Sequence, residues 1–225
     1  MKITNLLVAG AISLAAAATA SAGTIRVADG LAGLNGTDPT GGAFIVTSLT
    51  GYNGETGGPG GSATSFATFC LERSENLSFG PIYTTTIDTA AKLGGVSGGN
   101  PDPISEATAL LYYTFRKGGA IAGDVVDTAD EVSGLQYAFW TLEGEGTPAG
   151  TPAVNAFAAA YISWATSNAV TGQFLNVRVL NPYQNGAPRQ SLLTLVPLPT
   201  AAWMGLGLLG SAAGVSYMRR RSVMA

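Results

Sequence analysis

The sequence contains a single cysteine, Cys70, and no histidine. The lack of histidine excludes Ser-His-Asp and Cys-His catalysis together with most zinc sites, and one cysteine cannot build a thiolate metal cluster. Proteins outside the cytoplasm usually pair their cysteines or avoid them. Three interpretations of Cys70 are therefore open: a buried and inert side chain, a cross-link between two chains, or a group that takes part in a reaction.

Gln136 is the second residue that could take part in such a reaction. It belongs to the segment Leu135-Gln136-Tyr137-Ala138-Phe139-Trp140. A capping box at Thr128 and Glu131 predicts the start of the helix that carries this segment. The apolar stripe of the helix is Val132, Leu135, Phe139 and Leu142, and Gln136 lies beside it. We expect the stripe to face a sheet, so the amide of Gln136 must find a hydrogen-bond partner there.

Cys70 belongs to a strand predicted over residues 65–72, which ends in Phe69-Cys70-Leu71-Glu72. Side chains alternate between the two faces of a strand, so Phe69 and Leu71 share one face while Cys70 and Glu72 share the other. If the two large apolar residues face a core, Cys70 points the opposite way.

Together these two segments, within residues 65–143, resemble the thioester domains of bacterial surface adhesins. In that family an aromatic-Cys-apolar-polar motif supplies a thiol, and a Gln-x-Ala-apolar-Trp motif supplies an acyl group. The resemblance implies a bond between the sulfur of Cys70 and the side-chain carbonyl carbon of Gln136, formed with loss of ammonia. Leu135 stands where the family usually has threonine, and Phe139 stands where it has isoleucine or valine.

A thioester is an activated acyl group, and burial beside Tyr137 and Trp140 would protect it from water. Attack by an amine gives a stable amide and frees the Cys70 thiol, so the protein would capture one partner and would not be an enzyme. Without histidine as a base, we expect primary amines rather than sugar hydroxyls to react. The alternative is an inert buried Cys70 and a core helix whose glutamine bonds to the backbone.

The first 22 residues are expected to be a secretory signal peptide. Lys2 supplies the positive start, residues 6–18 are almost entirely apolar, and Ala20-Ser21-Ala22 offers small residues at the cleavage positions. The apolar run is shorter than the roughly 20 residues that span a bilayer. We therefore expect cleavage, with the mature chain beginning at Gly23.

The last 30 residues, 196–225, are expected to be a sorting signal. An uncharged segment over residues 200–218 is a marginal membrane span, and the arginines after it would remain in the cytoplasm. The order of motifs resembles the PEP-CTERM signal, in a Val-Pro-Leu-Pro variant. The resemblance implies processing by an exosortase in the inner membrane of a Gram-negative bacterium, then release or attachment to the cell surface or extracellular matrix. An ordinary tail anchor is the alternative. The residues of the motif are Val196, Pro197, Leu198, Pro199, Arg219, Arg220 and Arg221.

The region between these two ends, residues 23–195, has a length that suits one domain. Short β-rich runs precede and follow three helical segments, which predicts an α+β fold with an antiparallel sheet or sandwich and a helical insertion carrying Gln136. The glycine-rich stretch 51–61 is predicted to be a mobile loop. A pI near 4.8 argues against nucleic acid as a partner. No metal or cofactor is expected, because the acidic residues near Thr128 are typical of helix capping rather than of a calcium site.

Overall fold

The computed structural model describes residues 21–30, 42–146 and 148–197. These residues form an antiparallel sheet and three helices, which confirms the α+β class. In chain order the elements are β1 (Ser21–Asp29), β2 (Phe44–Thr50), β3 (Ser65–Thr68), β4 (Ile82–Asp88), β5 (Ala90–Ala91), β6 (Asp102–Pro103), α1 (Glu106–Arg116), α2 (Ala129–Leu142), α3 (Pro152–Asn168), β7 (Val177–Gln184), β8 (Ala187–Pro188) and β9 (Leu192–Leu195).

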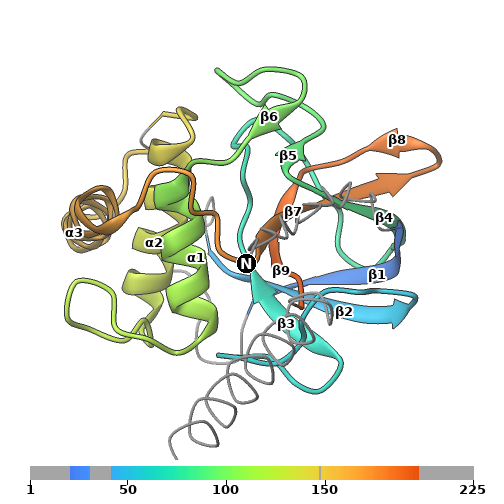
Figure 1. The fold of residues 1–225 in the computed structure, drawn as a ribbon, viewed down its shortest axis with the longest axis horizontal. Coiled ribbons are helices and arrows are strands. Elements are labelled where there is room, and N and C mark those ends of the chain that lie inside the picture. The colour runs from blue at the N-terminus through green and yellow to red at the C-terminus, as the bar shows by residue number, and fades with distance from the viewer. Residues whose placement is uncertain (1–20, 31–41, 147, 198–225) are drawn as a thin grey trace, which may run out of the picture.

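The main sheet has seven strands in the order β3-β2-β1-β4-β7-β8, and β9 also pairs with β7. Every pair is antiparallel. The helices lie on one side of the molecule and most of the sheet lies on the other (Figure 1). The strand pairing describes one main sheet beside the small β5–β6 pair, so the sandwich form of the fold prediction is not confirmed.

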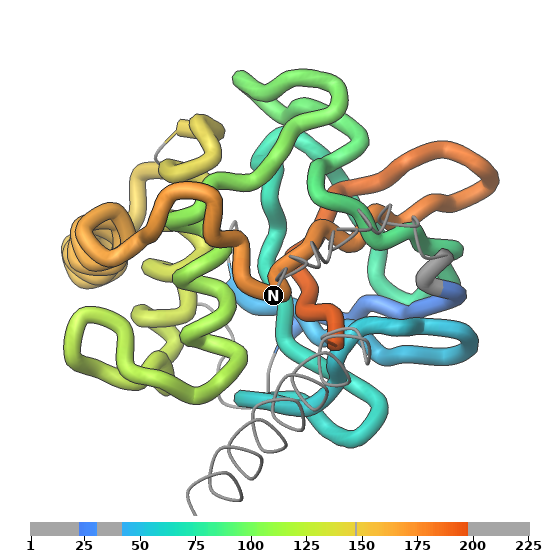
Figure 2. Tube along the Cα trace, viewed as in Figure 1, coloured from blue at the N-terminus to red at the C-terminus, as the bar shows by residue number. Residues whose placement is uncertain are grey.

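The sheet is nearly closed through the segment that follows β3. Residues 65–72 were predicted as one strand, but β3 ends at Thr68, opposite the first residue of β2. Beyond that point the chain changes its partner, because Cys70 forms a β-bridge with Leu192 of β9. The tube in Figure 2 shows this segment running between the helices and the sheet. Cys70 therefore lies where the two ends of the sheet meet.

Alternating side chains divide the core into two clusters. Phe69 and Leu71 pack with residues of the helices in one cluster. Cys70 packs in the other, among inward-facing strand residues such as Val46 and Leu180. The predicted alternation of Phe69 and Leu71 against Cys70 is thus confirmed, and Cys70 faces away from the main helical core.

The starts of the helices follow from their capping residues. The predicted capping box of α2 is confirmed. The side chain of Thr128 accepts from the N–H of Glu131, and the carboxylate of Glu131 accepts from the N–H of Thr128. In the sequence, Asp102 followed by Pro103 is a cap-and-first-turn signal that predicts the start of the first helix there, and this prediction is wrong. Those two residues are extended and pair with β5, and Ser105 caps α1 by accepting from the N–H of Thr108.

Helices α2 and α3 approach closely at Gly134. A methyl group added at Gly134 would lie 2.6 Å from the Cβ of Phe157, which is closer than packed atoms allow. Glycine at this position therefore lets α3 pack directly on the backbone of α2. This contact supports the helix that carries Gln136.

The glycine-rich stretch 51–61, expected to be mobile, is fixed to α1 by Arg116. The guanidinium donates to the carbonyls of Glu55 and Gly57, at 3.1 and 3.2 Å, and it lies 4.8 Å from the centre of the Phe66 ring. Because Arg116 is only 4% exposed, these contacts are shielded from water. The side chain of Arg116 thus joins a loop, a strand and a helix.

Candidate functional site

Cys70 is placed by the hydrogen bonds of its two neighbours to β9. The N–H of Leu71 donates to the main-chain carbonyl of Ser191 at 3.1 Å, and the N–H of Leu193 donates to the main-chain carbonyl of Phe69 at 3.2 Å. In an extended segment the main-chain N–H and C=O groups of successive residues point to opposite edges. The N–H and carbonyl of Cys70 therefore point away from β9, toward α2.

Gln136 meets those main-chain groups of Cys70. The N–H of Cys70 donates to Oε1 of Gln136 at 3.0 Å, and Nε2 of Gln136 donates to the carbonyl of Cys70 at 2.8 Å. The side chain of Gln136 is 0% exposed, so the expectation that it is buried and finds a partner is confirmed. The two residues are 66 positions apart in sequence, and the fold brings them into direct contact.

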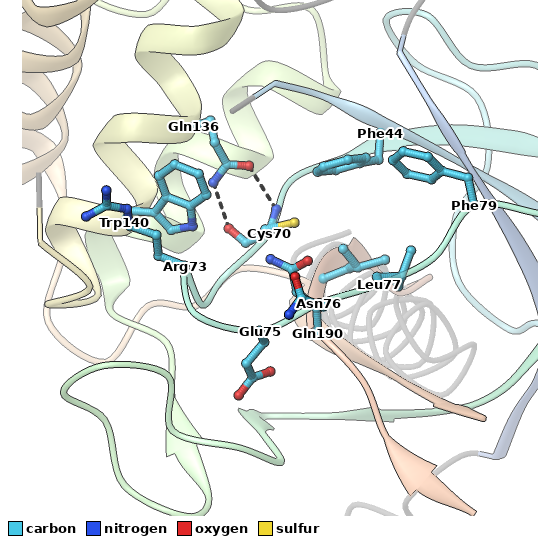
Figure 3. A pocket seen from close by; sticks show the side chains of 11 residues that line it. Phe44, Cys70, Arg73, Glu75, Asn76, Leu77, Phe79, Gln136, Trp140 and Gln190 are labelled. Carbon is cyan, nitrogen blue, oxygen red and sulfur yellow. Dashed lines mark hydrogen bonds between the residues drawn. The ribbon is translucent and has the colours of Figure 1, made fainter. Parts of the chain in front are cut away.

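The thiol of Cys70 lies in different surroundings from the main-chain groups that contact Gln136. In Figure 3 the sulfur points toward Phe44 and Leu77, not along the two hydrogen bonds to Gln136. Burial, followed by the nearby carboxyls of Glu72 and Glu75, raises the pKa of this thiol well above its ordinary value. The free thiol is therefore neutral at physiological pH and is a weak nucleophile in this state.

A cavity of about 280 Å³ opens on both candidate residues (Figure 3). Its wall combines aromatic and aliphatic side chains with polar ones, and Phe79 at its edge is 47% exposed. The cavity would give a small amine a route to the contact between Cys70 and Gln136. The lining residues are Phe44, Cys70, Arg73, Glu75, Asn76, Leu77, Phe79, Gln136, Trp140, Gln190 and Leu192.

Three glutamates lie near one another beside the cavity, and one of them, Glu75, lines it. Glu72 is 2% exposed, and burial, with the charge of Glu75, raises its pKa to about 9. Burial also raises the pKa of Glu75. Glu145, in contrast, accepts from the N–H groups of Arg73, Val96 and Ser97. Glu145 thus holds the loops around the site, while Glu72 is the carboxyl that burial keeps protonated at neutral pH.

The remaining residues of the two predicted motifs are all buried and lie on two sides of Gln136. Tyr137 and Trp140 belong to the cluster that contains Cys70, and their rings stack with centres 5.8 Å apart. Only Trp140 of this pair lines the cavity. The residues that pack in the helical cluster with Phe69 and Leu71 are Leu135, Ala138 and Phe139.

Several cavity residues were not identified from the sequence. Arg73, Glu75, Asn76 and Phe79 belong to the connection between β3 and β4, and Gln190 precedes β9. No periodicity or motif marks them, because loop residues are brought to a site by the path of the chain. For the four residues between β3 and β4, the position just after the Cys70 motif is the one available signal, and Gln190 has none.

The predicted sorting motif lies mostly outside the described residues. Val196 is joined to the fold, since its N–H donates to the carbonyl of Asn176 and its own carbonyl accepts from the Asn176 side chain. Pro197 is exposed. Leu198, Pro199, Arg219, Arg220 and Arg221 are not described, nor are the first 20 residues of the predicted signal peptide. Within the described parts of the chain, none of the helices has the length and apolar character needed to cross a membrane.

Among the acidic residues near the start of α2, Glu131 takes part in capping. Glu131 accepts from the N–H groups of Asp127 and Thr128. In the part of the chain that the structure describes, no three or more His, Cys, Asp or Glu side chains are grouped in a way that could hold a metal ion.

Comparison with known proteins gives no relative for this chain. It matches no protein-family model, no curated protein and no solved structure.

Proposed function

We propose that this protein is an exported surface or extracellular-matrix protein in which Cys70 and Gln136 form an internal thioester that captures an amine-bearing partner. The observation that carries the proposal is the pair of hydrogen bonds by which the main chain of Cys70 holds the carboxamide of Gln136. The cavity beside this contact supports it, because an amine needs access to the bond.

The bond would form by attack of the Cys70 sulfur on the side-chain carbonyl carbon of Gln136. The C–N bond breaks, the thiol hydrogen ends on the departing nitrogen, and ammonia leaves. The N–H of Cys70 already donates to Oε1, the oxygen on which negative charge develops during attack. The sulfur points elsewhere in the unreacted chain, so bond formation requires rotation about the Cα–Cβ bond of Cys70.

Capture would follow when a primary amine enters the cavity and attacks the same carbonyl carbon. The C–S bond breaks, an amide forms, and the Cys70 thiol is restored. The expected partner is an amine-bearing polymer of the surface or matrix, such as an amine-containing polysaccharide. Each molecule would react once, so the protein would not be an enzyme, and it would need no cofactor.

Export and processing form the other half of the proposal. The signal peptide over residues 1–22 would direct the chain out of the cytoplasm, and an exosortase-type enzyme would cut near the Val-Pro-Leu-Pro motif after transient insertion of the tail in the inner membrane. The described fold reaches Val196, which Asn176 holds. A cut after that residue would leave every described strand and helix in place.

A second candidate is a non-covalent structural or binding component of an exopolysaccharide matrix. It is favoured by the same two hydrogen bonds, which satisfy the buried amide of Gln136 without any reaction. The neutral, buried thiol of Cys70 agrees with this alternative as well.

Intact mass of the protein recovered after export distinguishes the two candidates. The thioester predicts a mass that is lower by one ammonia than the sequence of the mature chain. Methylamine should then add to Gln136 and expose a thiol at Cys70. Cys70→Ala is the matched control, because residue 70 keeps its main-chain bonds to Gln136 while the sulfur is lost. An unmodified mass with a free thiol before any treatment would reject the covalent function and leave the non-covalent one.

A further inference from the structure

Trp140 carries a buried donor with no acceptor. Its side chain is 3% exposed, and Nε1 has no hydrogen-bond partner among the described residues. Buried indole N–H groups usually find an acceptor, so this exception needs an explanation. Trp140 also lines the cavity with Cys70 and Gln136, and in Figure 3 the nitrogen edge of its ring faces the main-chain carbonyl of Cys70.

In the unreacted chain that carbonyl already has a donor, Nε2 of Gln136. The proposed bond removes this donor, because the nitrogen of Gln136 leaves as ammonia. Oε1 of Gln136 keeps its hydrogen bond from the N–H of Cys70. Bond formation would therefore leave one buried acceptor, the Cys70 carbonyl, beside one buried donor, the Trp140 indole.

We propose that the Nε1–H of Trp140 replaces Nε2 of Gln136 as the donor to the Cys70 carbonyl once the thioester has formed. This inference rests on the proposed function. Trp140 is then a positioning residue for the bonded state: it holds α2 against the Cys70 segment after the original hydrogen bond is lost. Pairing these two groups satisfies both of them in the reacted protein, whereas the unreacted protein leaves the indole unpaired.

The same exchange should reverse when ammonia opens the bond, because attack by ammonia restores the carboxamide of Gln136, whose Nε2 can again donate to the Cys70 carbonyl. Methylamine would not restore this bond, because a trans secondary amide carries its methyl group on the side of Oε1 and turns its single N–H away. With ammonia, the indole of Trp140 would return to its unpaired state. The donor to the Cys70 carbonyl should thus alternate between Gln136 and Trp140 as the bond forms and opens.

Nuclear magnetic resonance of the ¹⁵N-labelled exported protein tests this exchange. The indole N–H signal of Trp140, identified by its loss in Trp140→Phe, should shift downfield and exchange more slowly with solvent in the bonded protein than after the bond has been opened with ammonia. The indole signal of Trp164 on α3 is the internal control and should not move. In addition, Trp140→Phe should shorten the half-life of the thioester toward hydrolysis several-fold, and Trp164→Phe should not.

Intact mass measured on the same sample tests the thioester separately from the role of Trp140. A mass deficit of one ammonia with an unchanged Trp140 signal before and after ammonia treatment would overturn the role of Trp140 alone. Absence of the mass deficit would overturn both the thioester and this role. If Trp140→Phe does not fold, the comparison of the wild-type protein before and after ammonia treatment still decides the question.

Discussion

The side chain of Gln136 takes the place of a β-strand beside Cys70. One edge of the segment around Cys70 bonds to β9, and on the other edge the N–H and carbonyl of Cys70 bond to the carboxamide of Gln136. An amide side chain presents an acceptor and a donor as a peptide group does, so it can continue the hydrogen bonding beyond the point where β3 stops pairing with β2. This one side chain therefore joins α2 to the segment around Cys70.

Replacing Gln136 by leucine should destabilise the fold strongly. Leucine is of similar size but leaves the buried N–H and carbonyl of Cys70 without partners, at about 1–3 kcal/mol for each group. We expect the free energy of unfolding in urea to fall by roughly 2–6 kcal/mol. Gln173→Leu, at an exposed position, is the control and should change it by less than about 0.5 kcal/mol. Equal stability of the two variants would contradict the structural role of Gln136.

Cys70 should react slowly with alkylating reagents in the folded protein. Methylamine treatment ensures that its thiol is free whether or not a thioester had formed. Since its pKa is raised and the side chain is 3% exposed, we expect alkylation by iodoacetamide at pH 8 to be at least about tenfold slower in the native state than in urea. The control places a cysteine at exposed Ser74 in a Cys70→Ala background, and it should react at similar rates in both states. A fast native reaction at Cys70 would show that the thiol is accessible.

Glu72 should make the protein less stable as pH rises. Its pKa in the folded protein is about 9 against an ordinary value of 4.5, because burial and the charge of Glu75 disfavour the carboxylate. The native state keeps a proton that the unfolded chain loses, so this contribution is complete below about pH 4.5 and is lost progressively toward pH 9. Glu72→Gln, which stays neutral, should flatten the decline by up to about 1.4 kcal/mol per pH unit.

Urea unfolding of the wild type and Glu72→Gln across this pH range measures the effect. Glu131→Gln is an informative control, because the pKa of Glu131 is lowered: burial acts to raise it, but hydrogen bonds from the N–H groups of Asp127 and Thr128 outweigh that effect. Its contribution to stability is lost as pH falls, so this variant should alter the acid side of the profile instead. Parallel profiles for the wild type and Glu72→Gln would mean that Glu72 is ionised in the folded protein.

Arg116→Lys should loosen the loop over residues 51–61. A lysine cannot donate to the carbonyls of Glu55 and Gly57 in the same planar arrangement. We expect a loss of about 2–4 kcal/mol in the free energy of unfolding and faster cleavage within the loop in limited proteolysis. Exposed Arg26→Lys provides the comparison and should leave both measurements unchanged. Unaltered proteolysis of Arg116→Lys would show that other contacts hold the loop.

The parts of the site that the sequence could predict are those controlled by local patterns. The capping box at Thr128 and the apolar stripe beside Gln136 placed that side chain in the interior, and strand alternation separated Cys70 from Phe69. The closure of the sheet was not predictable in this way. The partner of Cys70 is Leu192, and no local pattern around either residue specifies the other. The cap at Ser105 was missed because Asp102 and Pro103 form an equally good helix-start signal and are used in a strand pair.

The bridge between Cys70 and Leu192 also determines when the site can form during synthesis. The Cys70 segment and α2 leave the ribosome well before β9, whose last residue is Leu195. Until β9 docks, the hydrogen bonds from Leu71 to Ser191 and from Leu193 to Phe69 are missing, and the main chain of Cys70 is not oriented toward Gln136. Long-range pairing of this kind is a late folding event. A truncated or partly translated chain therefore contains both chemical groups without the arrangement that brings them together, so the proposed thioester is expected to form only after β9 has docked.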